Sequence, residues 1–571
     1  MPRSTLTLYA LSLLALGCGP DKPGPWETGP VREDSADSDS APVVDSTPGD
    51  SPVDTGCADP ATWYTDADGD GYGDPATVAS GCAPPEGVVD QAGDCDDAEP
   101  LAWTGAEDVC GDGVDNDCDG VDPSGCNLTG RLDVTDGALH LVGKGAGECF
   151  SDAMTLVGDW TGDGEPEIVS GAPNAIIGVQ VPGAVYVFEG GAWSGELVGD
   201  DAIAKTFGES SYADFGAALA VLDDVDGDGL QELAVGAPGA YDGRTGTQPG
   251  MVVVYQGVAG AELVERARLM GTEMLSYAGW SLAATGDRDG DSVPDLAVGL
   301  HDLGWATGTY TGGVELVSGA LIAGGGDMDI GVGGVGVTLS ATDKLSMAGM
   351  DVASGDDVDG DGVSDVLVGS RGMASTAAWL LTTWVEDDAL LDDVTALQVH
   401  TDETDDFEGI AVALPGDMDG DGYSELAVGA IWDGPDSAGA VYVLSGTLSG
   451  PQDLSAATSV LTGETSGAHA GNALDRYGDL DGDGKMDLLV GSRGYRDLDG
   501  AAYVVCDPPP GTSSLADAPL SWEGTAGDEV GQSVRGVGDL DRDGVPDAFI
   551  GAPNAVTSGG PGEAWLWFAG L

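Results

Sequence analysis

The chain has 571 residues, with 100 Asp+Glu against 18 Lys+Arg, which gives a formal net charge of -82. This charge excludes nucleic-acid binding, because that function needs a basic surface to replace the counterions along the phosphates. The hydrophobic fraction of 42% is nevertheless ordinary for a folded protein. Since so many like charges repel one another, the composition predicts carboxylates gathered around bound cations.

Residues 1–18 have the pattern of an export signal. Arg3 supplies a positive charge, Leu6 to Leu16 form an apolar run, and Gly17 and Cys18 follow it. The apolar run is shorter than the roughly 20 residues that a bilayer-spanning helix needs. We therefore expect the chain to be exported and this segment to be removed.

The residues that end at Cys18, Leu-Ala-Leu-Gly-Cys, resemble the lipobox of bacterial lipoproteins, although Ala15 stands where that family prefers Leu. The resemblance implies that Cys18 is diacylated and becomes the mature N-terminus, with the lipid as the only contact to the membrane. Gly19 replaces the Asp that often retains such proteins at the inner membrane, which favours an outer-membrane lipoprotein facing the cell surface or the periplasm. The alternative is ordinary secretion with cleavage nearby.

Residues 19–56 are dominated by Pro, Ser, Thr, Asp and Gly. Such a segment buries too little apolar surface to offset the entropy of ordering, so we predict a disordered, extended acidic linker. Residues 57–127 then contain an even number of cysteines, which in an exported chain predicts a disulfide framework with 15 possible pairings. These cysteines are Cys57, Cys82, Cys95, Cys110, Cys118 and Cys126.

Two acidic loops lie within this cysteine-rich module. Alternate carboxylates followed by a turn glycine give the hard oxygen ligands and the sharp turn that a calcium loop requires. The candidate ligands are Asp66, Asp68, Asp70 and Asp74 in the first loop, and Asp115, Asp117, Asp119 and Asp122 in the second. These two loops predict up to two calcium ions.

The order of three segments in the module, residues 63–74, 93–97 and 115–120, resembles the MopE-like metal-binding motif of exported bacterial proteins. Metals and disulfides commonly staple domains that have little core. A structural role is the favoured reading of the module, and metal sensing is the alternative.

One unit then recurs seven times in residues 128–571. Each unit has an acidic loop, and a glycine stands twelve residues after its first Asp in every unit, from Gly171 to Gly551. Another glycine stands eight residues before that Asp in six units, whereas the first unit has Ser151. Each unit reads as four short apolar runs bounded by Gly, Pro or Asp, which predicts four strands. No sustained 3.6-residue period is present, so we expect little helix.

The motif Phe215-Gly216 before the loop and Gly236-Ala237-Pro238 after it resembles the FG-GAP repeat of integrin α-subunits. The resemblance implies an all-β fold, a seven-bladed β-propeller of the integrin α N-terminal type, in residues 128–571. A lone strand-like run, Ala138 to Val142, precedes the first unit, and the last unit stops after its third run. We therefore expect residues 138–142 to complete the last blade and close the ring.

Six of the seven loops present carboxylates at positions 1, 3, 5 and 9, and we expect a backbone carbonyl to serve as the ligand at position 7. Turns alone do not require this register, and apposed carboxylates without a cation repel one another. We therefore predict about seven calcium ions. The ligands are Asp159, Thr161, Asp163 and Glu167; Asp224, Asp226, Asp228 and Glu232; Asp287, Asp289, Asp291 and Asp295; Asp357, Asp359, Asp361 and Asp365; Asp417, Asp419, Asp421 and Glu425; Asp479, Asp481, Asp483 and Asp487; Asp539, Asp541, Asp543 and Asp547.

Two loops depart from this pattern. Thr161 replaces a carboxylate in the first loop, which weakens that site, and Ser292 replaces the turn glycine in the third, which strains it. In the family that the chain resembles, these loops lie on the face away from the ligand. Calcium is therefore expected to rigidify the blades and to take no part in chemistry.

The sequence contains no catalytic constellation. Its four His do not cluster, and no nucleophile elbow, zinc-binding helix motif or phosphate loop is present. We expect a non-enzymatic protein that acts in adhesion or in binding an unknown protein or glycan, through the loops that follow each Gly-Ala-Pro position. We expect the aromatic residues of those loops to be exposed; they are Tyr241, Trp305, Tyr310, Trp432 and Tyr495. The alternatives are a surface-coat scaffold and a polysaccharide-acting enzyme, for which Arg244, Arg371 and Arg493 are the suggestive residues.

Overall fold

The computed structural model describes residues 61–65, 72–81, 88–89, 91–95 and 130–568, except for 192, 259–262, 305–307, 372–375, 401–407, 526 and 555–559. The chain divides into two compact units, which are described separately. No helix among these described residues is long and apolar enough to cross a membrane.

The smaller unit contains a three-stranded antiparallel sheet in the order β2-β1-β3. Its strands are β1 (Ala61–Thr65), β2 (Asp74–Gly81) and β3 (Val88–Val89). Most of the calcium ligands predicted in the cysteine-rich module lie outside the described residues, and only Asp74 falls on a strand, the first residue of β2. Cys95 is disulfide-bonded.

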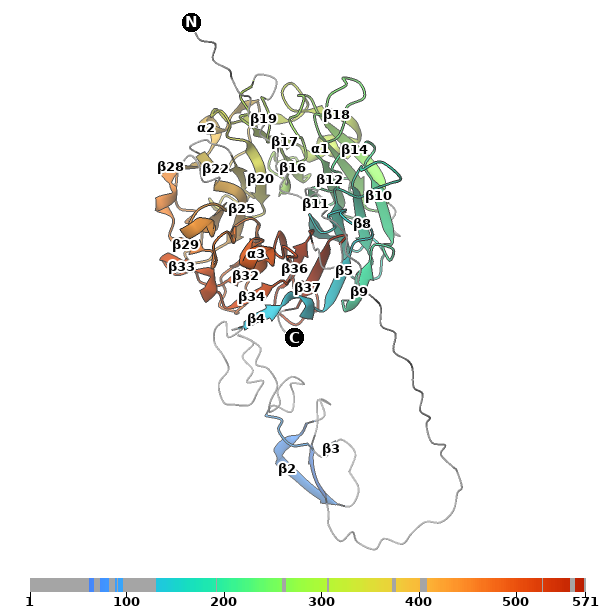
Figure 1. Ribbon diagram of the computed structural model, residues 1–571, viewed down its shortest axis with the longest axis vertical. Helices are drawn as coiled ribbons and strands as arrows, with labels where there is room; N and C mark the ends of the chain where they lie inside the picture. Colours follow the sequence, from blue (N-terminus) through green and yellow to red (C-terminus); the bar gives the residue numbers. More distant parts are fainter. Residues whose placement is uncertain are drawn as a thin grey trace, which may run out of the picture. The chain divides into compact units, whose positions relative to one another are not determined.

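The larger unit is a ring of seven sheets, each built on four antiparallel strands, which confirms the seven-bladed β-propeller (Figure 1). The first three blades consist of β6 (Met154–Val157), β7 (Glu167–Ala172), β8 (Ala184–Phe188) and β10 (Ala204–Phe207); β11 (Leu219–Leu222), β12 (Glu232–Ala237), β13 (Met251–Gln256), β14 (Val264–Gly271) and β18 (Gly326–Ile330); β15 (Leu282–Gly286), β16 (Asp295–Gly299), β17 (Gly313–Val317), β19 (Val337–Ser340) and β23 (Ala389–Leu390).

The remaining four blades follow in chain order around the ring. They consist of β20 (Ala348–Ser354), β21 (Val366–Ser370), β22 (Thr376–Leu381), β24 (Leu397–His400) and β28 (Gly450–Asp453); β25 (Glu408–Gly416), β26 (Glu425–Ala430), β27 (Ala440–Leu444), β29 (Ser459–Thr462) and β33 (Gly511–Ser514); β30 (Leu474–Gly478), β31 (Asp487–Ser492), β32 (Ala501–Val505), β34 (Leu520–Glu523) and β4 (Gly130–Asp133); β35 (Ser533–Gly538), β36 (Asp547–Ala552), β37 (Glu563–Trp567), β5 (Leu139–Val142) and β9 (Gly195–Val198).

The prediction of four strands per blade is incomplete, because six of the seven described sheets have a fifth strand. This strand lies between the third and fourth strands of one blade in sequence, but it pairs in parallel with the outer strand of the preceding blade. For example, β28 pairs with β24, and β33 pairs with β29. Each fifth strand therefore ties two neighbouring blades together.

The ring closes as predicted, and a second strand that was not predicted also joins the start of the propeller to its end. β5 pairs antiparallel with β37 and completes the seventh blade. β4, which precedes it, pairs in parallel with β34 as the fifth strand of the sixth blade. Residues from the start of the propeller thus join two blades at its end.

Helices among the described residues are short and lie at the ends of the strands. They are α1 (Gly319–Gly324), α2 (Leu391–Val394), α3 (Tyr495–Leu498), η1 (Val134–Asp136), η3 (Pro435–Ser437), η4 (Leu454–Ala456) and η5 (Leu515–Asp517). η1, η4 and η5 each link a fifth strand to the fourth strand that follows it. Their preceding residues Asp133, Asp453 and Ser514 cap them by accepting a backbone N–H two residues on.

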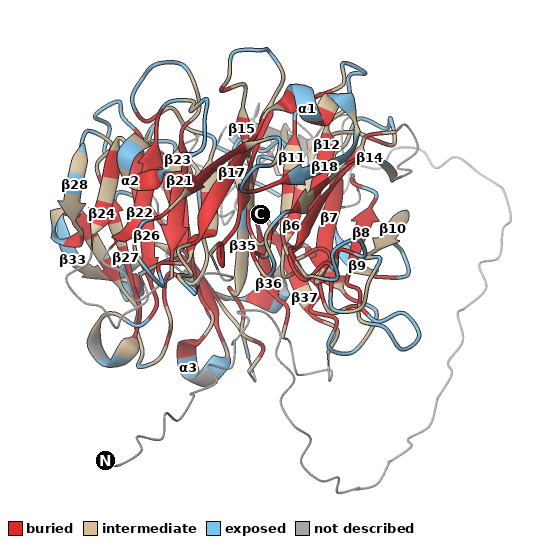
Figure 2. Cartoon of the chain, turned by 90° about the horizontal axis from the view of Figure 1, so that it is seen from above, coloured by how far each residue is buried: buried red, intermediate tan, exposed pale blue. Residues whose placement is uncertain are grey.

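The hydrophobic core lies in layers between adjacent blades. The second strands are the most buried, and every residue of β7, β12 and β36 is buried. One layer joins Ile168 and Phe188 of the first blade to Phe549 and Leu566 of the seventh. Figure 2 shows these buried strands between exposed loops, with α1 and α2 at one end of the strands and α3 at the other.

The two glycines that recur in each unit, one before and one after the acidic loop, meet where adjacent blades pack together. A Cβ on Gly171 would lie 1.9 Å from the carbonyl oxygen of Gly216 in the next blade, so no larger residue fits there. Gly216 has φ +93°, and Ser151 takes the same left-handed region with φ +73° in the first blade. Close backbone packing between blades therefore explains the repeated glycines.

Cys149 is disulfide-bonded and Cys506 forms no disulfide, so these two cysteines of the propeller do not pair with each other.

Candidate functional site: the acidic loops and the opposite end of the propeller

Each acidic loop connects the first and second strands of a blade, so all seven lie at the same end of the strands. The blade 2 loop shows how the chain builds it. Asp224 accepts backbone N–H bonds from Gly227 and Gly229 at 2.6 and 2.8 Å, which folds the loop around its carboxylate. Gly227 and Gly229 both have positive φ, near +80° and +92°. The glycines therefore permit a turn that brings alternate carboxylates together.

The carboxylate at position 9 closes the loop from the second strand. In the second blade, Glu232 Oε2 accepts the Val225 N–H at 2.7 Å, while Glu232 Oε1 is buried without a hydrogen-bond partner. The same arrangement places a buried oxygen without a hydrogen-bond partner on Asp365 and on Glu425. A buried carboxylate oxygen of this kind is costly unless a cation binds it.

Burial raises the pKa of Glu232, Asp365 and Glu425 to about 7, and further carboxylates of the same loops add to the shift. Burial raises the pKa of Asp487 to about 7 as well. These loops therefore hold carboxyl groups in a setting that disfavours negative charge, and a bound divalent cation would reverse that preference.

The structure brings most of the predicted ligands together. Carboxylate oxygens within 4.8 Å of one another come from Asp224, Asp226, Asp228 and Glu232; from Asp159, Asp163 and Glu167; from Asp287, Asp289 and Asp291; from Asp357, Asp359 and Asp361; and from Asp417, Asp419 and Glu425. Clusters of hard oxygen atoms of this kind fit calcium in donor type.

Two loops differ from the second in ways that follow their sequences. In the first loop both oxygens of Glu167 accept N–H bonds, from Trp160 at 2.7 Å and Thr161 at 3.0 Å. In the third loop Asp295 accepts N–H bonds from Arg288 and from Gly319, both at 2.8 Å. Ser292 adopts φ +70°, the left-handed region that the turn glycines of the other loops occupy, so the expected strain at this residue is present.

Three loops place a basic side chain against a predicted ligand, which the sequence analysis missed. Arg266 Nη1 lies 2.7 Å from Asp226 Oδ2, and Lys485 Nζ lies 2.6 Å from Asp483 Oδ2. Arg288 Nη1 lies 3.9 Å from Asp365 Oδ1, and both side chains are fully buried. Position 2 of the other six loops carries Trp, Val, Met or Leu, so Arg288 was detectable as an exception.

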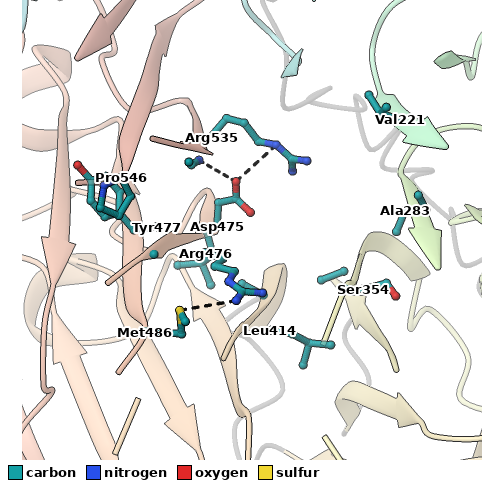
Figure 3. A pocket seen from close by; sticks show the side chains of 18 of the residues that line it. Val221, Ala283, Ser354, Leu414, Asp475, Arg476, Tyr477, Met486, Arg535 and Pro546 are labelled. Carbon is teal, nitrogen blue, oxygen red and sulfur yellow. Dashed lines mark hydrogen bonds and ion pairs between the residues drawn. The ribbon is translucent and has the colours of Figure 1, made fainter. Parts of the chain in front are cut away.

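The channel along the propeller axis is lined by the first strands of the blades. Its larger cavity has a volume of about 740 Å³ and contains Arg476 and Arg535 (Figure 3). Arg535 Nε lies 3.6 Å from Asp475 Oδ2, and Arg476 Nη1 lies 3.4 Å from Asp356 Oδ1. Both cations of this cavity therefore have carboxylate neighbours.

The loops after the second strands lie at the opposite end of the propeller and carry several exposed apolar side chains. Tyr241 is 50% exposed and Trp432 is 39% exposed, as predicted. Tyr495 is buried, so the prediction that it is exposed is wrong: it packs in the core, and its hydroxyl donates to Glu523 Oε1 at 2.9 Å. Tyr310 is half-buried, and Trp305 lies outside the described residues.

Comparison with known proteins agrees with this geometry. The FG-GAP repeat model matches residues 215–255 and 409–444, and the Cu-binding MopE metal-binding motif matches residues 94–122. The chain is 34% identical to human integrin alpha-7 over 152 residues, which cover 25% of this chain and 11% of that protein. It is 34% identical to Cricetulus griseus integrin alpha-3 over 28% of this chain and 15% of that protein.

Gallus gallus integrin alpha-6 is 33% identical over 28% of this chain and 14% of its own length. The matched region therefore spans only a small part of each integrin. The chain carries FG-GAP repeats in an integrin-α-like seven-bladed propeller, together with a MopE-like metal-binding motif.

Proposed function

We propose that this protein is an exported, calcium-stabilised propeller that acts in adhesion or ligand binding at the cell surface. The relatives with FG-GAP propellers are integrin α-subunits, which supports a binding role. In this proposal Cys18 carries the lipid that anchors the chain, and the propeller does not catalyse a reaction.

Calcium is the proposed cation of the seven acidic loops. The loop residues fit a calcium ion. Glu232, Asp365 and Glu425 each have a buried carboxylate oxygen without a hydrogen-bond partner, and each lies among other carboxylates. Calcium supplies charge neutralisation and oxygen coordination there, while the loop glycines and N–H groups orient the carboxylates. Because the ion binds only the folded loop, it stabilises the fold by mass action.

The observation that carries the binding role is the separation of the two ends of the propeller. The acidic loops occupy one end, whereas the loops at the other end expose apolar and aromatic side chains. Val179 is 98% exposed and Tyr212 is 67% exposed, in loops at the same end as those of Tyr241 and Trp432. Aromatic side chains of this kind are enriched at the centres of protein interfaces. The partner is therefore proposed to bind the end opposite the acidic loops.

A variant series tests this assignment. Cells that display the full chain are compared for adhesion with cells displaying Tyr241→Ser and Trp432→Ser, and with the matched control Tyr423→Ser at the acidic end, where Tyr423 is 44% exposed. We expect the first two substitutions to reduce adhesion at least tenfold and the control to leave it unchanged. Equal adhesion of all three variants and the parent would contradict a binding role for this end.

A further inference from the structure

A second cavity lies on the axis at the end of the propeller that exposes the aromatic side chains. It has a volume of about 280 Å³, and its lining includes Asp152, Trp280, Asn472, Arg493 and Gln532. These residues come from blades spread around the ring, and we name this cavity the axial mouth. It adjoins the larger axial cavity, since Asp351, Leu474 and Arg535 line both.

Arg493 places a guanidinium in the axial mouth that has few hydrogen-bond partners among the described residues. It follows β31 at the third position of Gly-Ser-Arg, where three other blades have Pro. Its backbone N–H donates to Asn472 Oδ1 at 2.8 Å, which fixes the loop. Its guanidinium reaches Gln532 Oε1 only at 3.5 Å, and no carboxylate of the described residues lies within 4.0 Å of it. Most of the guanidinium's five donors are therefore left for a ligand.

The charge environment makes this arrangement unusual within so acidic a protein. Most other lysines and arginines of the propeller pair with a carboxylate, as Arg535 and Arg476 do in the neighbouring cavity. Burial lowers the pKa of Arg493, although Glu529 and Asp152 oppose the shift. Burial and the positive charge of Arg493 also lower the pKa of Arg371, the matching residue of the fourth blade. The guanidinium of Arg493 is thus held partly away from bulk water, which costs free energy that an anion would recover.

Asp152 does not fully balance the charge of Arg493. Burial raises its pKa to about 7, with the negative charge of Asp214 adding to the shift and Arg493 opposing it. The carboxyl group is therefore protonated in a substantial fraction of molecules at neutral pH. A carboxylate from outside would complete the bidentate geometry that a guanidinium offers.

The surrounding surface decides which anion fits. The net charge of -82 repels polyanions, so an isolated carboxylate on a neutral or basic molecule is favoured over an acidic polymer. The cavity is smaller than the roughly 300–1,000 Å³ of a pocket that encloses a whole ligand. His469 packs against Trp432 with ring centroids 4.6 Å apart, and Arg493 contributes to lowering the pKa of His469, so the mouth adjoins the exposed aromatic side chains.

We propose that the axial mouth binds a single carboxylate, from an acidic side chain or the C-terminus of a protein partner, through the guanidinium of Arg493. This assignment rests on the proposed binding function and names the chemistry that its partner presents. Gln532 and Asn472 hold Arg493 in place, and the exposed aromatic residues contact the partner around the inserted group.

The test uses calcium-loaded residues 19–571 and two small probes, N-acetylglycine and N-acetylglycinamide, which differ in one carboxylate. We expect the acid to bind saturably, measured by calorimetry or by shifts of indole NMR signals, and the amide to bind at least tenfold more weakly. Arg493→Gln should weaken binding of the acid at least tenfold, while Arg493→Lys should retain part of it. The control is Arg496→Gln, three residues along the same loop, where Arg496 pairs with Glu523 instead.

Equal binding of the acid and the amide, or unchanged binding in Arg493→Gln, would overturn the proposal. If the variant loses its calcium stoichiometry or its melting temperature, the comparison of the acid with the amide on the parent chain still decides the proposal. Binding of D-glucuronate at least tenfold tighter than N-acetylglycine would overturn the protein partner in favour of an acidic glycan. Failure of the carboxylate site leaves the adhesion loss in Tyr241→Ser and Trp432→Ser intact, so the two proposals can fail separately.

Discussion

Arg266 forms an ion pair with Asp226, a predicted calcium ligand of the second blade. Its guanidinium lies 2.7 Å from Asp226, and its side chain is largely buried. Even at the dielectric constant of water, a unit charge about 5 Å from a divalent ion costs roughly 1.5 kcal/mol, or about tenfold in affinity. This loop should therefore bind calcium more weakly than its four carboxylates alone suggest.

We predict that Arg266→Met raises the calcium affinity of one site about tenfold and lowers the melting temperature of the calcium-free protein. The matched control is Arg268→Met on the same strand, because Arg268 pairs with Glu209 and Glu265 away from the loops. Calcium titration by calorimetry measures both variants. An unchanged or reduced affinity in Arg266→Met would show that the guanidinium does not oppose the ion.

Asp152 predicts a dependence of stability on pH. Because burial raises its pKa from 3.8 to about 7, the folded state disfavours the ionised form. The resulting loss of stability is absent below the unfolded value, grows as the pH rises through this interval, and is complete above pH 7. Asp214 adds to this shift and Arg493 opposes it, so the net effect includes both neighbours.

We therefore expect Asp152→Asn to raise the melting temperature at pH 8 and to have a much smaller effect at pH 5. Thermal unfolding in saturating calcium at the two pH values measures the difference. Asp327→Asn, on the exposed surface of β18, serves as the control and should show no such dependence. A larger gain at pH 5 than at pH 8 would contradict the assigned burial of Asp152.

The candidate calcium ligands of the loops were predictable from their spacing in the sequence alone. The spacing of Asp224, Asp226, Asp228 and Glu232 is enough to expect one cluster, and the structure contains it. Asp295 shows the limit of this reasoning, because the N–H of Gly319 that binds it comes from 24 residues along the chain. Arg266 likewise contacts Asp226 from 40 residues away, so no local sequence pattern predicts this ion pair.

At the scale of elements, the fifth strands were the feature that the sequence did not predict. β9 and β33 are four residues long and largely exposed or half-buried, without the apolar alternation that marks a strand. Their pairing depends on a neighbouring blade, which a single repeat does not contain. The lone run of residues 138–142, by contrast, was predictable because its apolar residues Leu139 and Leu141 are fully buried.

The two closing strands lead to a prediction about truncation. Deleting residues 1–142 removes β4 and β5 and leaves the outer edges of the sixth and seventh blades without their strands. It also removes Arg131, which pairs with Glu523 at 2.6 Å and with Glu464 of the fifth blade. An open sheet edge favours pairing between molecules. We expect this truncation to unfold at a much lower temperature and to aggregate.

Deleting residues 1–127 retains both closing strands, so it serves as the control. Cys149 is disulfide-bonded and Cys506 is not, so either deletion removes the cysteine that pairs with Cys149, and both truncations therefore carry Cys149→Ser. The control should unfold at a clearly higher temperature than the longer truncation. Thermal unfolding and light scattering compare the two truncations. If both behave alike, either β4 and β5 do not close the ring or the preceding module contributes equally to its stability.

At the scale of the whole molecule, the account depends on cations that neutralise one end of a ring of seven blades. The net charge of -82 destabilises a compact chain through self-repulsion, and bound cations would reduce this repulsion. The opposite end is then left to bind a partner through aromatic side chains and the guanidinium of Arg493. This division explains why acidic and apolar residues are both abundant in the same repeats.

Calcium titration of residues 19–571 by calorimetry, paired with thermal unfolding in calcium and in chelator, tests this claim most directly. The account predicts about seven to nine bound ions, seven of them in the propeller loops, and a large fall in melting temperature on chelation. A chain that binds no calcium and melts at the same temperature in both conditions would contradict the metal assignment and the explanation of how so acidic a protein folds.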